Sequence, residues 1–314
     1  MAAPSEDDYD EFSFLEDIAQ EWGLTRPEAL RVARRDVVLG PDQSLSSIVW
    51  GEGPPAIAFL HGGGQNAHTW DAVLLALARP AVAIDLPGHG RSSWRPDKDY
   101  SPWKNAEAIE VALPILAPRA KAVVGMSLGG ATNIRLAATR PDLVKKAVIV
   151  DVTPQVGDAV KEMTRAERGA VALVSGPSTY ATFEAMAEAA IASSPNRSPA
   201  AVRRGVRHNA KRLANGHWGW RYDLFGDEKG GRTTSDFTPL WEDVSRITVP
   251  VMLVLGGDSK FVSDGHVSEM RRRLPQLRVE IVPGAGHSVQ SDKPLDLARV
   301  IESFVFDDSG GPGD

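Results

Sequence analysis

The chain of 314 residues contains no cysteine. Disulfide bonds, thiolate catalysis and cysteine-based metal sites are therefore excluded, although the lack of cysteine does not by itself define the cellular compartment. The chain also lacks any apolar run close to the roughly 18 residues that a membrane-spanning helix needs. Its acidic N-terminus has neither the basic region nor the apolar core of a secretory signal, so a cytoplasmic location is expected.

An excess of positive charge is missing as well. The formal net charge of −6 at pH 7 argues against nucleic acid or an anionic membrane as a general partner. The hydrophobic content of 42% is that of an ordinary globular protein, so a folded core is expected.

Residues 1–29 are interpreted as an acidic N-terminal extension with one short amphipathic helix. Phe14, Leu15, Ile18 and Trp22 fall at helical spacing within it. We expect this helix to dock on the body of the protein, with a lid or a homodimer contact as the alternatives.

Continuous apolar runs mark the strands of the expected core. Such runs lie at residues 56–60, 82–85, 122–124, 147–150 and 251–255. Runs of this kind are typical of parallel strands covered by helices on both faces. The core is assigned to residues 30–153 and 241–306, and residues 307–314 are expected to be a disordered tail.

Residues 154–240 interrupt this alternation of strands and helices. Their alanine-rich pattern is helical over residues 159–174, 180–192 and 199–213, without a strong strand signal. A helical insertion into the core is therefore predicted.

The octet at residues 123–130 carries the clearest functional signal. It reads Val-Val-Gly-Met-Ser-Leu-Gly-Gly, with an apolar run before it and a helix-compatible stretch after it. A serine on a sharp strand-to-helix turn projects outward, and its hydroxyl lies at the helix N-terminus, where backbone N–H groups favour a developing anion. Gly125 and Gly129 leave room for backbone to pass close to the turn. Ser127 is therefore the candidate nucleophile.

A serine hydroxyl needs a base, a group that orients the base, and donors for the oxyanion. Among the seven histidines, His287 is the best candidate base, because it lies in a glycine-rich loop directly after the predicted strand at residues 279–282. His68 is a candidate residue of the substrate pocket.

Two further glycine-rich loops come directly after predicted strands. Residues 60–66, Leu-His-Gly-Gly-Gly-Gln-Asn, can turn an N–H group toward a carbonyl oxygen. Residues 85–92 are interpreted as a tight structural turn. Neither loop has the Lys-Ser/Thr of a phosphate-binding loop or the spacing of a dinucleotide fingerprint, so phosphate binding is disfavoured.

Together these motifs resemble the α/β-hydrolase fold superfamily. The matching motifs, in the family's order, are His61-Gly62-Gly63, Asp85-x-Pro-Gly-His-Gly-x-Ser92, Gly125-x-Ser127-x-Gly129 and Gly286-His287. The resemblance covers roughly residues 45–153 and 241–306. It implies an α/β fold: an eight-stranded, mostly parallel sheet sandwiched by helices, with a helical cap inserted after the sixth strand. That is where residues 154–240 fall. It also implies that the backbone N–H groups of Gly63 and Leu128 form the oxyanion hole, and that neither cofactor nor metal is needed.

Two residues compete for the role of the triad acid. The family most often places this acid after the seventh strand, where the chain has Ser259 at the usual position and Asp258 one residue earlier. Asp151 lies 24 residues after Ser127 and matches a subgroup whose acid follows the sixth strand. Asp151 is preferred, and Asp258 is the alternative.

The predicted activity is that of a serine hydrolase that cleaves a carboxylic ester or a related acyl bond through an acyl-enzyme. A C–C bond hydrolase, a lactonase or an acyltransferase would use the same triad, and a non-catalytic ligand receptor is a more distant alternative. Ser127 and Leu128 disfavour haloalkane dehalogenase and epoxide hydrolase activities, because those relatives need an aspartate nucleophile.

The expected partner is a small molecule with an apolar acyl or aromatic group. Trp218 and Trp220 lie in an aromatic segment that either lines the substrate pocket or forms the core of the insertion itself. Trp70 and Met126 are weaker candidates for the pocket.

Overall fold

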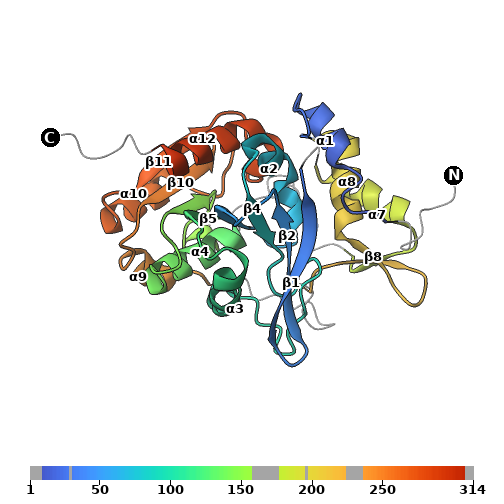
Figure 1. Ribbon diagram of the computed structural model, residues 1–314, viewed down its shortest axis with the longest axis horizontal. Helices are drawn as coiled ribbons and strands as arrows, with labels where there is room; N and C mark the ends of the chain where they lie inside the picture. The colour runs from blue at the N-terminus through green and yellow to red at the C-terminus, as the bar shows by residue number, and fades with distance from the viewer. Residues whose placement is uncertain (1–8, 28–29, 158–176, 195–196, 224–235, 308–314) are drawn as a thin grey trace.

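Figure 1 shows the computed structural model of the chain. The structure describes residues 9–27, 30–157, 177–194, 197–223 and 236–307. Within these ranges, no helix combines the length and the apolar character that crossing a membrane requires.

An eight-stranded sheet forms the centre of the molecule, in the order β1-β2-β4-β3-β5-β6-β10-β11. Its strands are β1 (Val32–Gly40), β2 (Gln43–Trp50), β3 (Ile57–Leu60), β4 (Ala81–Ile84), β5 (Ala122–Met126), β6 (Ala147–Val150), β10 (Val251–Gly256) and β11 (Arg278–Val282). Strand β2 pairs antiparallel with β1 and β4, and every other neighbouring pair is parallel. The predicted eight-stranded, mostly parallel sheet is confirmed.

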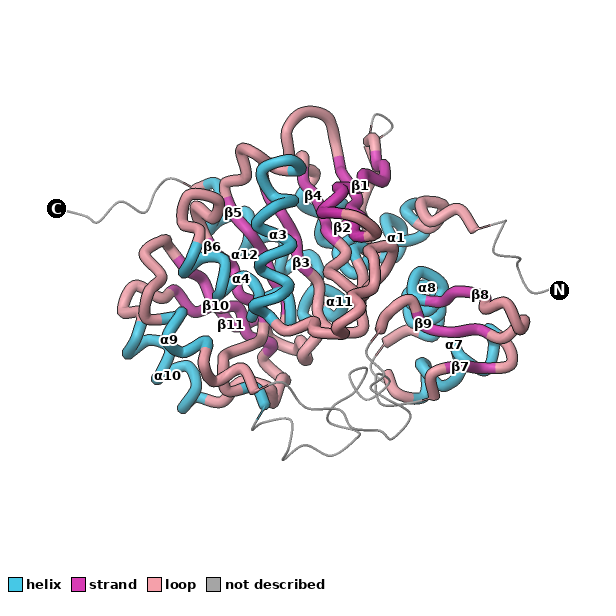
Figure 2. Tube along the Cα trace, turned by 90° about the horizontal axis from the view of Figure 1, so that it is seen from below, coloured by secondary structure: helices cyan, strands magenta, loops and turns pink. Residues whose placement is uncertain are grey.

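Helices cover both faces of this sheet (Figures 1 and 2). One face packs against α3 (Pro102–Leu116), α4 (Leu128–Thr139), α9 (Leu240–Val244) and α10 (Asp264–Arg273). The other packs against α1 (Leu15–Glu21), α2 (Asp71–Leu77), α11 (Val289–Asp292) and α12 (Pro294–Phe306). Because successive side chains of a strand point to opposite faces, Ala58 and Leu60 enter the first core and Ile57 and Phe59 the second. The apolar runs are continuous because both faces are buried.

A smaller group of elements comes after β6 and lies apart from the large sheet in Figure 2. It consists of β7 (Thr179–Tyr180), α7 (Phe183–Ala192), α8 (Pro199–Asn209), β8 (Ala210–Arg212) and β9 (Trp218–Trp220), and we call these elements the small lobe. Its three strands pair antiparallel in the order β7-β9-β8. These three short strands accompany the helices that the sequence predicts for this segment, and the sequence contains no strong signal for them. Strands of two or three residues are too short to give a recognisable alternation of apolar and polar residues in the sequence. The helix predicted at residues 159–174 lies outside the described residues.

The N-terminal helix α1 packs between the core and the small lobe (Figure 1). Leu15, Ile18 and Ala19 are buried in the same apolar core as α2. On the other side, Arg204 of α8 forms an ion pair of 2.5 Å with Glu21 at the end of α1. The helix therefore contacts both parts of the molecule.

Candidate active site

Ser127 lies on a strained turn between β5 and α4. Its φ of 50° is unusual for a residue other than glycine, and its ψ is −114°. A Cβ on Gly125 would overlap the carbonyl group of Gly129, and a Cβ on Gly129 would overlap the carbonyl of Leu60. Only glycine at both positions lets the strand, the turn and the helix pack this closely.

Ser127 and Asp151 come directly after neighbouring strands at the carboxyl edge of the sheet. The N–H group of Ser127 donates to the carbonyl of Val150 at 3.0 Å, which ties the turn to the end of β6. Asp151 is the next residue, and its own φ of 52° turns the chain sharply. The parallel pairing of β5 with β6 therefore brings the two residues side by side.

The carboxylate of Asp151 is completely buried and holds His287. Its Oδ2 lies 2.7 Å from His287 Nδ1 and also accepts a hydrogen bond of 2.5 Å from Ser259 Oγ. Its Oδ1 accepts a hydrogen bond of 3.0 Å from the N–H of Gly256. Such charge-assisted bonds stabilise the ionised carboxylate. When Nδ1 of His287 donates to it, Nε2 carries the lone pair that can accept a proton.

Asp258 has a different environment. It is exposed, and its side chain forms no hydrogen bond or ion pair with the described residues. Ser259, which occupies the family's usual acid position, instead donates to Asp151. The structure thus brings Asp151, and not Asp258, to His287.

Phe261 is a neighbour of His287 that sequence reasoning missed. The two rings are stacked, with centroids 3.6 Å apart and planes inclined by 11°. Because Phe261 is only 3% exposed, it keeps water from one face of the imidazole and restricts rotation of the ring. The only signal in the sequence was that Phe261 and Val262 form an apolar pair shortly after Asp258.

The candidate oxyanion donors lie together. A Cβ built on Gly63 would be 4.0 Å from Leu128 Cδ2, and one built on Gly62 would be 3.3 Å from Ser127 Cβ. In the described part of the chain, the N–H groups of Gly63 and Leu128 donate no hydrogen bond. Both groups are therefore available to a ligand beside the serine.

A cavity of about 800 Å³ adjoins Gly63 and His287, whereas Ser127 and Leu128 are not among the residues that line it. Residues that line it include Gly63 and His287 of the core, Ile18 and Trp22 of the N-terminal segment, and Ser194 and Trp220 of the small lobe. Its size suits a small to medium-sized organic molecule.

The five candidate substrate residues divide between this cavity and the apolar cores. His68 and Trp220 line the cavity. Trp70 is fully buried against Phe59, with ring centroids 5.1 Å apart, and Met126 is 1% exposed in the same core. Trp218 packs in the core of the small lobe. Trp70, Met126 and Trp218 therefore serve packing, because each is buried within an apolar core.

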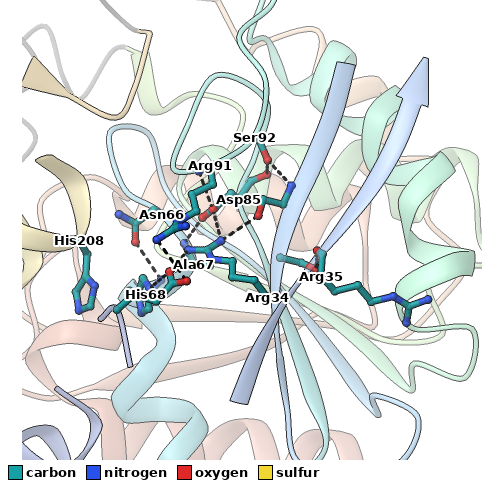
Figure 3. Close-up of polar contacts among 12 residues, drawn as sticks. Arg34, Arg35, Asn66, Ala67, His68, Asp85, Arg91, Ser92 and His208 are labelled. Carbon is teal, nitrogen blue, oxygen red and sulfur yellow. Dashed lines mark hydrogen bonds and ion pairs between the residues drawn. The ribbon is translucent and has the colours of Figure 1, made fainter. Parts of the chain in front are cut away.

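His68 belongs to a buried ionic network (Figure 3). Its Nδ1 lies 2.9 Å from Asp71 Oδ2, and its Nε2 lies 3.0 Å from Glu11 Oε2 of the N-terminal segment. Burial opposes protonation, but the charge of Asp71 and the two hydrogen bonds outweigh it and raise the pKa of His68 to about 9. Glu11 also pairs with Arg34 at 2.9 Å, and Arg34 pairs with the buried Asp85 at 2.6 Å.

The ligand atoms of His68, Asp71 and His208 lie within 4.8 Å of one another, as in a metal site. The imidazole rings of His68 and His208 are, however, stacked 3.8 Å apart and nearly parallel, at 15°. A metal ion must lie in the plane of each ring that binds it, and two parallel rings share no such point. Both nitrogens of His68 also contact carboxylates already. The arrangement therefore fits a hydrogen-bonded stack better than a metal site.

Comparison with known proteins agrees with this geometry. A model of the alpha/beta hydrolase family matches residues 57–300, so the chain belongs to that family and is a hydrolase.

Among individual proteins, the chain is similar to Esterase Rv0045c of Mycobacterium tuberculosis, with 47% identity over 299 residues that cover 94% of this chain and 96% of the esterase. A solved structure of that esterase, described together with its inhibition by transition metals, has a TM-score of 0.82 and covers 95% of this chain and 99% of its own. The sn-1-specific diacylglycerol lipase ABHD11 of Mus musculus is 31% identical over 255 residues, or 80% of this chain and 81% of the lipase.

Proposed function

We propose that the chain is a serine hydrolase of carboxylic esters, in which Ser127, His287 and Asp151 form the catalytic triad. The observation that carries the proposal is the 2.7 Å contact between His287 Nδ1 and the buried Asp151 carboxylate, at the sheet edge where Ser127 occupies a strained turn. The similarity to a mycobacterial esterase supports an ester as the substrate.

In the proposed reaction, Ser127 Oγ attacks the ester carbonyl carbon while His287 Nε2 accepts its proton. Asp151 keeps the proton of the imidazole on Nδ1 and stabilises the imidazolium that forms. The N–H groups of Gly63 and Leu128 donate to the oxyanion. When the tetrahedral intermediate collapses, His287 returns the proton to the leaving alcohol, and water then hydrolyses the acyl-enzyme by the same steps.

The small lobe acts as a cap in this proposal. Together with the N-terminal segment it encloses the cavity next to His287, with Trp220, Ile18 and Trp22 as apolar wall residues. The lining also contains charged side chains such as Arg204 and Asp292, so the apolar acyl group expected from the sequence stays a prediction. The cytoplasmic location expected from the sequence stays a prediction.

Ser127→Ala tests the proposal. With p-nitrophenyl esters of graded chain length, this variant should lose turnover and labelling by a fluorophosphonate probe. Ser268→Ala is the matched control, because Ser268 is exposed on α10 and its hydroxyl bonds only its own helix. Wild-type-like turnover in Ser127→Ala would contradict the proposal. Lactones and diketones assayed in parallel show whether the triad cleaves a lactone or a C–C bond instead of a simple ester.

A further inference from the structure

Asn209 is the last residue of α8, and its side chain reaches from the small lobe to the glycine-rich loop of the core. Its Nδ2 donates a hydrogen bond of 2.6 Å to the carbonyl of Gly64, and its Oδ1 accepts one of 3.2 Å from Asn66 Nδ2. Its own carbonyl accepts a hydrogen bond of 2.7 Å from the N–H of Arg221. The side chain is only slightly exposed, so these contacts are shielded from water.

The loop that Asn209 contacts has little steric support of its own. Gly62, Gly63 and Gly64 are consecutive, and Gly64 has a φ of 74° in the left-handed region. Glycine has no Cβ that restricts the backbone, so the orientation of each peptide group depends on its hydrogen bonds.

Most of these hydrogen bonds come from the core itself. The carbonyl of Gly62 accepts from His61 Nδ1 at 2.8 Å and from the N–H of Gln65 at 3.2 Å. The N–H of Gly64 donates to His89 Nε2 at 3.1 Å. Burial lowers the pKa of His89 to about 3, so its ring is neutral and Nε2 can accept. Each peptide group that flanks Gly63 thus has a hydrogen-bond partner, and the Gly63 N–H itself donates no hydrogen bond to the described residues.

The next peptide group, between Gly64 and Gln65, has its carbonyl held by Asn209 of the small lobe. The N–H of this peptide group, that of Gln65, donates at 3.2 Å to the Gly62 carbonyl, which belongs to the same peptide group as the Gly63 N–H. We propose that Asn209 is a positioning residue: by holding the Gly64 carbonyl it keeps the Gly63 N–H directed at the reacting carbonyl oxygen. This inference rests on the proposed ester hydrolysis. The oxyanion site is then fully ordered only when α8 is docked on the core, which couples the position of the cap to the chemical step.

Loss of this positioning affects the transition state more than the bound substrate. An N–H group stabilises the developing oxyanion only at about 2.7 to 3.1 Å and in the right direction. An interaction that is stronger in the transition state changes kcat, whereas uniform binding changes KM. A loosened Gly64 peptide group should therefore lower kcat and leave KM nearly constant.

Two variants test the proposal. Asn209→Ala removes the donor, and Asn209→Asp keeps the shape but places a carboxylate oxygen against the Gly64 carbonyl. Tyr9→Phe is the matched control, because it removes the 2.5 Å bond between Tyr9 and His208 of α8 without touching the loop. The measurements are kcat and KM for a p-nitrophenyl ester, and Ki for a trifluoromethyl ketone with the same acyl chain. The unhydrated form of this ketone forms a covalent bond with Ser127 Oγ, and its oxygen then lies as an oxyanion beside the N–H groups of Gly63 and Leu128.

Both Asn209 variants should lower kcat by about 10-fold to 100-fold. This loss does not exceed the loss caused by removing an oxyanion donor outright. The Ki of the trifluoromethyl ketone should rise by the same factor, with KM changed less than about threefold. Tyr9→Phe should leave these values within about twofold.

The proposal is overturned if kcat of both Asn209 variants stays within about twofold of the wild type, or if the loss is confined to KM with Ki unchanged. It is also overturned if Tyr9→Phe causes an equal loss, since docking of the lobe in general would then explain the effect. Circular dichroism identifies a variant that fails to fold. If Asn209→Ala fails to fold, the kinetics of Asn209→Asp, which has the same size as asparagine, decide whether the proposal holds. Failure of the ester hydrolase proposal is distinguishable, because the wild type would then turn over no ester or Ser127→Ala would remain active.

Discussion

Replacing Asp151 by asparagine should nearly abolish turnover while the fold is kept. The carboxylate accepts three hydrogen bonds, from His287, Ser259 and Gly256. An asparagine whose oxygen keeps the Gly256 N–H must present its NH₂ group to His287. The imidazole then offers a lone pair at Nδ1 and carries its proton on Nε2, so it cannot accept the proton of Ser127.

The size of the effect results from this change of tautomer and from the loss of the negative charge beside the imidazolium. A loss of about 10⁴-fold in kcat is expected. At about 1.36 kcal/mol for each factor of ten, this corresponds to about 5.4 kcal/mol of transition-state stabilisation. Asp258→Asn should change kcat less than about twofold, because its exposed side chain bonds none of the described residues.

The assay compares kcat and KM of Asp151→Asn and Asp258→Asn on one p-nitrophenyl ester, with active sites counted by fluorophosphonate titration. Thermal unfolding of each variant checks that the fold is intact. The assignment of Asp151 as the acid would be refuted if Asp151→Asn kept more than about a tenth of the wild-type kcat, or if Asp258→Asn caused the larger loss.

Three further predictions concern stability, and each can be measured by urea unfolding. Gly129→Ala should lower the free energy of unfolding by about 3 kcal/mol, because its Cβ would overlap the Leu60 carbonyl; an unchanged midpoint would show that the turn can relax. The folded pKa of His68, about 9, lies above its ordinary value of 6.5, so its stabilisation is complete below pH 6.5 and is lost as the pH rises through about 9. Between these values the wild type should lose about 1.4 kcal/mol per pH unit relative to His68→Gln, and parallel pH profiles would contradict the predicted charge. Arg34→Met should cost about 3 to 5 kcal/mol, because it leaves the buried Asp85 carboxylate without its 2.6 Å partner, and Asp85→Asn in that background should recover part of the loss.

The central sheet was predictable because its signal is local. Each apolar run between residues 56 and 255 is long enough to indicate a strand that is buried on both faces. The turn at Ser127 is indicated by the glycines on either side of it. The strands β7 to β9 were not predictable. They are two or three residues long, and they form because partners far apart in the chain meet in the small lobe.

The side chains around the candidate site show the same division. Trp70, Met126 and Trp218 have the residue types of a binding pocket, but which way they point depends on the packing around them. Glu11 and Asn209 carry no sequence motif at all. Glu11 contacts His68, 57 positions away, and Asn209 contacts Gly64, 145 positions away, so only the folded chain reveals these contacts.

By itself, the sequence determined the α/β sheet, the nucleophile-like turn at Ser127 and the glycine-rich loop of His287, because each depends on residues close together along the chain. It left Asp151 and Asp258 as competing partners for that histidine. The tertiary structure decided which of them contacts it: the end of β6 lies beside the end of β10, and the buried carboxylate of Asp151 meets His287 and Ser259 there. A hydrogen bond depends on distance and direction in space, and residues 136 positions apart acquire these only when the strands pair.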